Sequence, residues 1–301
     1  METILNLSGV NKKFGKQQAL QDITMTIRKG DIYGLVGRNG AGKTTLLKTI
    51  VRMIQPSSGS IQLFGNQNEK DYIKELKRVG NIIETPVAYD QLTAEQNLKY
   101  YCKINGVIEK DAVAKALKFV DLEDTGKKKY KNFSLGMKQK LGLAIALLNK
   151  PDFLILDEPI NGLDPVAIVE FRELLLKLNR EEGMTILISS HILDELYQVA
   201  TRFGFIKDGL LVQEMTKEEF DLKAQAFIKI EVDDVKKALQ TLGQMAIEDC
   251  KVVGQHQINV YQLETPIRQI VRELTMADLA IDGISLEGES LETYFKELVM
   301  N

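Results

Sequence analysis

Alternating and continuous apolar stretches along the first half of the chain predict a layered arrangement of strands and helices. Residues 4–10 and 22–28 alternate between apolar and polar positions, as the strands of a small antiparallel layer do. Residues 32–36, 153–156 and 185–190 are short apolar runs, too short for core helices, and are typical of buried parallel strands. The pattern therefore predicts an α/β fold.

A longer stretch with helical spacing separates these strands. Apolar residues from Thr93 to Leu148 recur mostly at helical intervals, which predicts an α-helical subdomain at about residues 85–150. Beyond it, Asp164-Pro165 begins a further helix that we expect to end at Gly183. The turn Asp208-Gly209 predicts the hairpin that closes this first part of the chain.

The remaining residues predict a second module, so we expect a first domain at residues 1–220 and a second at 221–301. The expected order is strand, helix, strand, strand, helix, strand, an α+β arrangement that is ferredoxin-like. A last helix is expected at 291–299. The expected elements of the module are 227–232, 235–242, 244–253, 257–262, 266–276 and 281–286.

Composition limits the classes of function. The 301 residues have a net charge of −3, with 44% apolar and 27% charged side chains, as in globular proteins of about two domains. Lys127–Lys131 is a short basic run that we interpret as a solvated loop, so no nucleic-acid partner is expected. The longest apolar run, 141–148, is too short to span a bilayer. Cys102 and Cys250 show no metal spacing, which agrees with a reducing cytoplasm.

A glycine-rich segment directly follows the apolar run 32–36. Residues 37–44 read Gly-Arg-Asn-Gly-Ala-Gly-Lys-Thr and match the pattern G-x-x-x-x-G-K-[ST]. Such glycines allow backbone N–H groups to surround phosphates at a helix N-terminus. Lys43 then supplies a positive charge, and Thr44 supplies a hydroxyl for Mg²⁺. The segment predicts a binding site for a nucleoside triphosphate.

Polar residues follow two of the predicted parallel strands. Asp157 and Glu158 come after one strand, and His191 comes after another that is predicted to lie beside it. Taken alone, two adjacent acids also fit the start of a loop, and a single histidine is more often structural. Together at one sheet edge, they predict that Asp157 holds Mg²⁺ and that Glu158 orients or deprotonates an attacking water.

Five motifs in this order resemble the ATPase subunit of ATP-binding-cassette (ABC) transporters over residues 1–220. The resemblance implies a P-loop NTPase with a RecA-like core, an antiparallel β layer and an α-helical subdomain. It also implies two cassettes facing head to tail around ATP and Mg²⁺, so that each site is completed by the other subunit. The motifs are the phosphate loop 37–45, the signature segment 133–139, the strand and acids 153–158, the segment 161–164 and the strand end 189–191.

The resemblance assigns expected roles to individual residues. Ser134 and Gly136 are expected to contact ATP across the dimer, Asp164 to lie at the interface, and Phe14 to stack on adenine unless it is a core residue. Expected nucleotide contacts are Phe14, Gly37, Arg38, Asn39, Gly40, Ala41, Gly42, Lys43, Thr44, Thr45, Glu84, Ser134, Gly136 and Asp164. Expected catalytic residues are Glu158, His191 and Lys43, and expected metal ligands are Thr44, Asp157 and Glu84.

Two departures from the family pattern narrow the resemblance. The family signature Leu-Ser-Gly-Gly-Gln reads Phe-Ser-Leu-Gly-Met at 133–137, which keeps the serine and the second glycine. Glu84 stands where the family normally has a glutamine, although an exposed acid at a strand end is the alternative interpretation. Both features resemble the bacitracin-export and lantibiotic-immunity branch of the family.

The function expected from this resemblance is export of a membrane-active compound, a peptide antibiotic of the bacitracin or lantibiotic type. The chain would act as a homodimer at the inner face of the cell membrane, beneath a separate transmembrane permease. Other exported substrates, such as a drug, an ion or a polysaccharide, stay open. A soluble ATP-gated clamp on the ribosome or nucleic acid is the alternative from a different class. A nucleotide-sensing regulator that hydrolyses little is a third hypothesis, and the acids at 157–158 argue against it.

Overall fold

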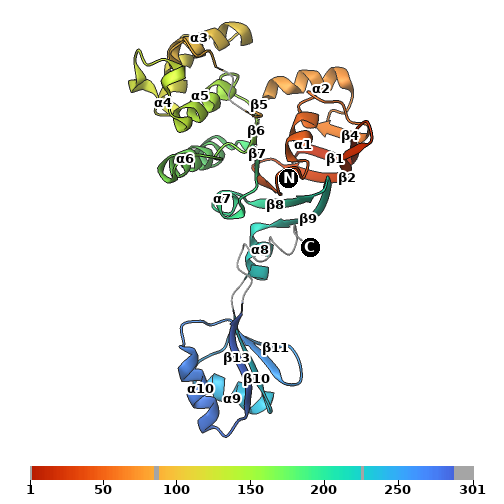
Figure 1. Cartoon of the computed structure of the whole chain (residues 1–301), viewed down its shortest axis with the longest axis vertical. Coiled ribbons are helices and arrows are strands. Elements are labelled where there is room, and N and C mark those ends of the chain that lie inside the picture. Colours follow the sequence, from red (N-terminus) through yellow and green to blue (C-terminus); the bar gives the residue numbers. More distant parts are fainter. Residues whose placement is uncertain (1, 85–87, 225–226, 288–301) are drawn as a thin grey trace. The chain divides into compact units, whose positions relative to one another are not determined.

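The computed structural model describes residues 2–84, 88–224 and 227–287. The chain divides into two compact units, Met1–Lys217 and Glu218–Glu297, close to the boundary expected at residue 220 (Figure 1). The expected helix at 291–299 lies outside the described residues.

The first unit contains two sheets and the helices that cover them (Figure 1). The smaller sheet is antiparallel, in the order β2-β1-β4, and the larger has the order β5-β6-β7-β3-β8-β9. The strands are β1 (Thr3–Phe14), β2 (Gln17–Arg28), β3 (Ile32–Val36), β4 (Ser58–Leu63), β5 (Val79–Ile82), β6 (Phe153–Asp157), β7 (Thr185–Ser190), β8 (Arg202–Lys207) and β9 (Leu210–Thr216). The helices are α1 (Lys43–Ile50), α2 (Glu69–Glu75), α3 (Ala94–Asn105), α4 (Ala112–Phe119), α5 (Leu135–Leu147), α6 (Pro165–Glu182) and α7 (Leu193–Tyr197), and α8 (Lys217–Ala224) begins at the boundary.

Parallel pairing in the larger sheet places the functional segments at one edge. β6 and β7 pair in parallel with Asp157 opposite Ser189, and β3 pairs in parallel with β7 so that Val36 lies opposite Ser190. The carboxyl ends of these three strands therefore lie side by side, as the sequence predicted for the acidic strand and the strand that ends at His191. β9 is antiparallel to β8 and forms the edge of the sheet.

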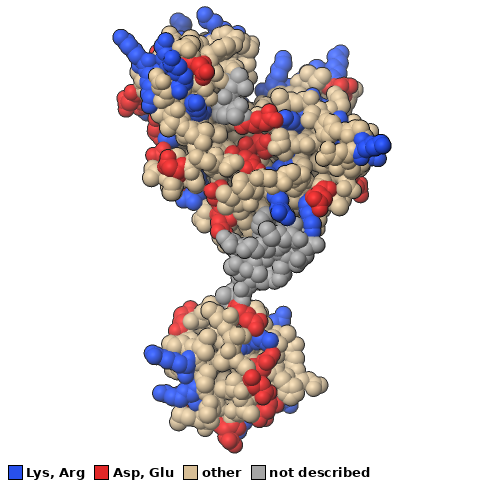
Figure 2. Space-filling view, in the orientation of Figure 1, with Lys and Arg blue, Asp and Glu red and all other residues tan. Residues whose placement is uncertain are grey.

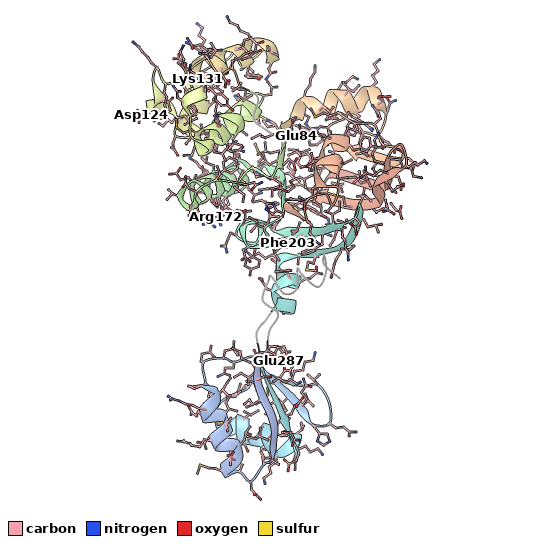
Figure 3. The ribbon with its side chains drawn as sticks, viewed as in Figure 1. Glu84, Asp124, Lys131, Arg172, Phe203 and Glu287 are labelled. Carbon is pink, nitrogen blue, oxygen red and sulfur yellow. The ribbon has the colours of Figure 1, made fainter. Side chains whose placement is uncertain are left out.

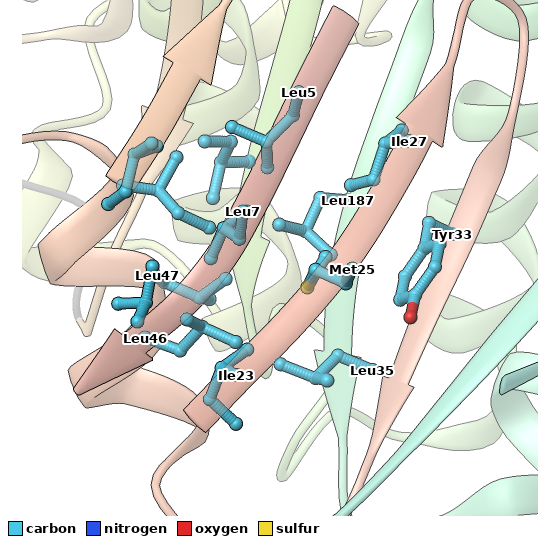
Figure 4. Packing of buried hydrophobic residues seen from close by; sticks show 14 of the residues in the cluster. Leu5, Leu7, Ile23, Met25, Ile27, Tyr33, Leu35, Leu46, Leu47 and Leu187 are labelled. Atoms are coloured by element: carbon cyan, nitrogen blue, oxygen red, sulfur yellow. The ribbon is translucent and has the colours of Figure 1, made fainter. Parts of the chain in front are cut away.

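The two sheets share one hydrophobic core (Figure 4). Leu5 and Leu7 of β1 and Met25 of β2 point inward because strand residues alternate between faces. They join Leu47 of α1 and Leu187 of β7, and none of the five side chains is more than 1% exposed. This core holds the helix that follows the phosphate loop against the sheet.

The helical subdomain comprises α3, α4 and α5, as predicted for this stretch. α3 begins at a capping box in which the Thr93 side chain accepts from the Gln96 N–H and the Gln96 side chain accepts from the Thr93 N–H. Asn97 is fully buried, accepts from the Tyr89 N–H (2.7 Å) and donates to the Thr93 carbonyl (3.0 Å). These bonds attach the preceding loop to the helix.

The second unit is a four-stranded antiparallel sheet with strand order β11-β12-β10-β13 and two helices. The expected order of strand, helix, strand, strand, helix, strand is confirmed, but the bounds of one strand were wrong, because residues 244–253 contain the end of α9 and a strand of only three residues. The apolar residues Met245 and Ile247 instead pack on the core of this unit as α9 ends. The ferredoxin-like assignment stays a prediction. The elements are β10 (Phe227–Val232), α9 (Val235–Gln244), β11 (Cys250–Val252), β12 (Gln257–Val260), α10 (Ile267–Met276) and β13 (Ile281–Glu287).

Three short helices, α2, α7 and α8, were not predicted. α2 contains seven residues and buries only Tyr72, whose hydroxyl donates to the Ile50 carbonyl (2.7 Å). Such short segments carry too little apolar periodicity to be recognised in a sequence. The helix α6 was predicted correctly, since it begins after Asp164 and ends at Gly183.

Replacing Leu187 by alanine is expected to lower the free energy of unfolding of the first unit by about 2–5 kcal/mol, because the fully buried side chain would leave a cavity between the sheets. Urea unfolding followed by circular dichroism measures the change. Leu222→Ala is the matched control, because this leucine is 74% exposed and its truncation is expected to change stability by less than about 0.5 kcal/mol. Equal effects of the two substitutions would contradict the placement of Leu187.

Candidate active site

A cavity of about 590 Å³ opens between the β1–β2 hairpin, the phosphate loop and the β8–β9 turn. Phe14 lies at the hairpin end of the cavity, and Lys43, Thr44 and Glu158 lie at the phosphate-loop end. The lining residues are Phe14, Gln17, Gln18, Ala19, Gln21, Asn39, Gly40, Gly42, Lys43, Thr44, Thr45, Glu158, Asp208 and Gly209. The position of Asp208 and Gly209 was not foreseen, because the sequence identified them only as a turn.

Close backbone contacts determine the shape of the phosphate loop. Gly42 has φ 109°, and a Cβ atom there would lie 2.8 Å from the Ala19 carbonyl oxygen. A Cβ atom on Gly37 would lie 2.5 Å from the Ile206 carbonyl oxygen. Neither position can take a side chain without a shift of the neighbouring strand. α1 begins at Lys43, so the loop ends at a helix N-terminus, where anions are favoured.

Lys43 and Glu158 form the charged centre of the site. The ammonium of Lys43 is 4% exposed and donates to the carbonyl oxygens of Gly37 (2.7 Å) and Arg38 (3.1 Å). It also lies 3.0 Å from Glu158 Oε1. The other carboxylate oxygen, Glu158 Oε2, lies 2.7 Å from His191 Nδ1. The three side chains that sequence analysis expected to be catalytic are therefore in one connected group.

Asp157 is the second acid at this sheet edge, and each of its two carboxylate oxygens accepts a hydrogen bond from a hydroxyl group. Its carboxylate is 5% exposed and accepts from Thr44 Oγ1 and from Ser189 Oγ, each at 2.7 Å. Ser189 Oγ in turn accepts from the Glu158 N–H (3.0 Å). Ser189 therefore positions both acids, a role that sequence analysis missed. The available signal was its position at the end of a strand predicted to pair with the acidic strand.

These groups fit a magnesium ion that keeps most of its ligands from water and phosphate. Thr44 and Asp157 provide hard oxygen atoms in direct contact with one another. Within residues 2–84, 88–224 and 227–287, no cluster of three or more His, Cys, Asp or Glu side chains could hold a metal by itself. Such a small protein ligand set is typical of Mg²⁺ bound together with a nucleotide.

Glu195 lies in α7, just after His191, and is a further acid near the site. Burial raises the pKa of its carboxyl group above the usual range, and the charge of nearby Glu158 acts in the same direction, whereas His191 opposes it. Glu195 Oε2 is buried and has no hydrogen-bond partner among the described residues. It does not share in the contacts that join Lys43, Glu158 and His191.

Three expected site residues lie away from the cavity, at the starts of α5 and α6. Ser134 accepts from the Met137 N–H (3.3 Å) at the start of α5, and Asp164 accepts from the Val166 and Ala167 N–H groups at the start of α6. Gly136, in the first turn of α5, faces the start of α6, because a Cβ atom there would lie 3.0 Å from Ala167 Cβ. None of the three lines the cavity of its own chain.

Other expected contacts differ in position. Phe14 is 47% exposed at the cavity edge, with Lys12 Nζ 4.8 Å from its ring centroid, so it is not a core residue. Arg38 is exposed, whereas Ala41 is buried in the core, and neither side chain lines the cavity. Glu84, labelled in Figure 3, is paired with Lys48 of α1 and its side chain is 62% exposed. Its expected contact with nucleotide or metal stays a prediction.

Comparisons with known proteins agree with this geometry. The sequence model of the family described as ABC transporter matches residues 20–161. The bacitracin transport ATP-binding protein BcrA of Enterococcus faecalis is 38% identical over 299 residues, which cover 99% of this chain and 97% of BcrA. The uncharacterized ABC transporter ATP-binding protein YcbN of Bacillus subtilis is 38% identical over 300 residues, 99% of this chain and 98% of YcbN. The chain belongs to the ABC transporter ATP-binding proteins.

Shorter relatives and solved structures extend this result. The lantibiotic transport ATP-binding protein SrtF of Streptococcus pyogenes is 42% identical over 218 residues, 72% of this chain and 92% of SrtF. The structure of cbiO1 from Clostridium perfringens has a TM-score of 0.67 at 27% identity and covers 74% of this chain and 92% of that chain. The predicted P-loop NTPase cassette fold is therefore confirmed. As a member of the family, this ABC protein binds ATP and is an ATPase.

Among the described residues of this ABC protein, no helix has both the length and the apolar character needed to cross a bilayer.

Replacing Ser189 by alanine is expected to lower the ATPase rate by about tenfold or more, because Asp157 would lose a bonded partner and the Glu158 N–H one of its acceptors. Steady-state phosphate release measures the rate. Ser190→Ala is the control, because the Ser190 hydroxyl accepts from the Ile192 N–H instead and contacts neither acid. Similar rates for the Ser189 and Ser190 variants would show that Ser189 does not position the acids.

Proposed function

We propose that this ABC ATPase powers export of a membrane-active peptide antibiotic through a separate membrane protein. The observation that carries the proposal is the match to a bacitracin transport ATP-binding protein along 99% of the chain, which includes the second unit. The lantibiotic transport relative supports the same class of exported peptide. With this role, the chain would reside on the inner face of the cell membrane.

The proposed working form is a homodimer with ATP between the subunits. Ser134, Gly136 and Asp164 do not line the cavity of their own chain, as expected for residues that serve the partner's nucleotide. A solved structure described as a dimeric bacterial ABC transporter cassette has a TM-score of 0.64 at 25% identity and covers 71% of this chain. Because the three residues lie at the N-termini of α5 and α6, the helix ends would favour the partner's phosphates.

The roles of the residues in each cavity follow from their contacts. Lys43 would hold the β- and γ-phosphates, and Thr44 and Asp157 would hold Mg²⁺, which when bound neutralises phosphate charge. Glu158 would turn its carboxylate from Lys43 to the attacking water and accept a proton from it. His191 would then lose its contact with Glu158 and donate to the γ-phosphate. When ATP binds, Lys43 would thus exchange the Glu158 carboxylate for the phosphates as its anionic partner.

For the second unit, we propose a ferredoxin-like module with a regulatory or dimer-contact role. The strand order β11-β12-β10-β13 supports the fold assignment. On the sheet face opposite the helices, Lys229 pairs with Glu231 (2.8 Å) and lies 3.8 Å from Glu287, so the charges there are balanced within the unit. The His256 ring lies 3.3 Å from the Val232 carbonyl oxygen, and the His256 carbonyl accepts from the Val232 N–H (2.9 Å). We assign no chemistry to this unit.

Glu158→Gln is expected to lower the ATPase rate by about 10²- to 10⁴-fold, because the amide keeps the size of the side chain but cannot accept the proton. ATP binding is expected to persist, so the variant should accumulate as an ATP-bound dimer in gel filtration. In cells that contain the membrane partner, resistance to the exported peptide should be lost.

Glu195→Gln is the matched control for this substitution, because it makes the same chemical change at a neighbouring carboxyl that bonds neither Lys43 nor His191. Its ATPase rate is expected to stay within about tenfold of wild type, which is a smaller decrease than the roughly hundredfold or larger decrease expected when a general base is lost. If Glu158→Gln hydrolysed ATP at the wild-type rate, Glu158 could not be the general base. Loss of ATPase activity without any loss of resistance would instead contradict the proposed export role.

We further propose that Glu84 couples the nucleotide site to the membrane partner. Glu84 follows β5, adopts a positive φ of 68° and pairs with Lys48, which lies on the helix that begins at the phosphate loop. A shift of α1 on nucleotide binding would therefore move Glu84. Residues 85–87, which continue the expected relay toward Leu98, lie outside the described residues.

Glu84→Ala is expected to leave the ATPase rate of the isolated subunit within about tenfold of wild type but to lower resistance in cells, because coupling is lost while the general base remains. Glu84→Gln, which restores the commoner family residue, should retain more resistance than alanine. Lys48→Ala should reproduce the alanine result, since it removes the other half of the ion pair. If resistance falls only in proportion to ATPase activity, Glu84 is an ordinary surface acid.

A further inference from the structure

One side of α3 exposes lysines and large apolar residues in adjacent rows. Lys99 and Lys103 form one row at a spacing of four residues, and Tyr100 and Ile104 form the next. Ile104 is 60% exposed, and Ile108, which follows the helix, is 95% exposed. We call these five residues the α3 patch. Ile104 and Ile108 neither line the nucleotide cavity nor pack in the core of the unit, so neither role explains their exposure to water.

A basic loop, Lys127–Lys131, lies next to the start of α3. Lys129 pairs with Thr93 in an isolated β-bridge, which attaches the loop to the cap of the helix. All four lysines of the loop are exposed, and none forms an ion pair with another residue that the structure describes. Figure 2 shows basic side chains gathered on this upper part of the subdomain, and Figure 3 labels Lys131 there.

The positive charge is local to this part of the molecule. The basic loop contains no acid, and residues 95–110 contain three lysines and two glutamates, whereas the whole chain has a net charge of −3. Glu95 is paired with Lys99 (2.6 Å), and Glu109 is paired with Lys115 (2.8 Å) and Lys150 (2.6 Å). These two glutamates are thus paired within the subdomain, whereas the lysines of the basic loop face solvent together with Glu123 and Asp124, which precede the loop.

We propose that the α3 patch and the basic loop contact the anionic headgroups of a membrane surface directly. Lysines beside exposed isoleucines and a tyrosine are the combination that binds at a lipid interface, because apolar side chains enter the headgroup region while the cations meet anionic lipid. A nucleic-acid backbone would use the lysines but would leave Ile104 and Ile108 in water. The lipid contact supplements any contact with the permease, and it rests on the proposed function only in placing the chain at a membrane.

The test is sedimentation of the purified full-length chain with vesicles, without nucleotide or permease. Wild type is expected to bind vesicles of phosphatidylcholine with about 30% phosphatidylglycerol at about 0.1 M salt, and to bind pure phosphatidylcholine at least tenfold more weakly. The combined Ile104→Glu and Ile108→Glu substitutions should weaken binding to the anionic vesicles by about tenfold or more, because apolar burial is lost and charge repulsion is added. Substituting Lys127, Lys129 and Lys131 by glutamine should have a similar effect.

Matched controls use the second unit. Val253→Glu with Met276→Glu makes the same kind of change at side chains that are 54% and 76% exposed, and Lys236, Lys237 and Lys251 to glutamine matches the lysine variant. These controls should bind vesicles as wild type does. All variants should keep wild-type ATPase activity, since none of these side chains lines the nucleotide cavity. This separates failure of the lipid contact from failure of the proposed function.

Three results would overturn the proposal. The first is wild-type protein that does not sediment with the anionic vesicles. The second is an isoleucine variant that binds them as wild type does, because the apolar half of the surface would then be irrelevant. The third is single-stranded RNA that binds wild type and the isoleucine variant equally and displaces both from vesicles, which would identify the basic loop as a general polyanion site.

Discussion

The fold around the active site depends on keeping the buried ammonium of Lys43 compensated. A cation that is 4% exposed costs several kcal/mol unless carbonyl oxygens and an anion surround it. The loop supplies the carbonyls of Gly37 and Arg38, and Glu158 supplies the anion from a different strand. Burial of one lysine therefore requires that the phosphate loop and the acidic strand end meet, which the parallel sheet ensures.

The parallel pairing of β6 and β7 also couples the positions of the polar residues at the ends of these two strands. Asp157 lies opposite Ser189 across the β6–β7 pair, and the Glu158 N–H donates to the same serine, so both acids depend on one neighbouring strand. His191 directly follows that strand. A movement of β7 relative to β6 would consequently alter the metal-binding acid, the expected base and the histidine together.

Much of the fold and site was predictable because its signals are local. The phosphate loop has a fixed spacing, the acids follow a short apolar run, and α6 has a capping aspartate and a terminal glycine. Ser189 and Lys48 were missed because a serine at a strand end and a lysine on a helix look ordinary until tertiary pairing gives them partners. The strand expected at 244–253 was placed too early for the opposite reason, since apolar residues that end a helix resemble a strand when only their hydrophobicity is considered.

The phosphate loop also contacts the antiparallel layer through bare backbone. Cβ atoms at Gly42 and Gly209 would lie 2.8 and 2.6 Å from the same Ala19 carbonyl oxygen, and the Gly209 N–H donates to the Ala41 carbonyl (2.9 Å). The contact between the phosphate loop and the strand β2 at Ala19 is thus made by main-chain atoms. The position of the hairpin against the phosphate loop is therefore independent of which side chains the hairpin carries, whereas a side chain at Gly42 or Gly209 would force the two apart.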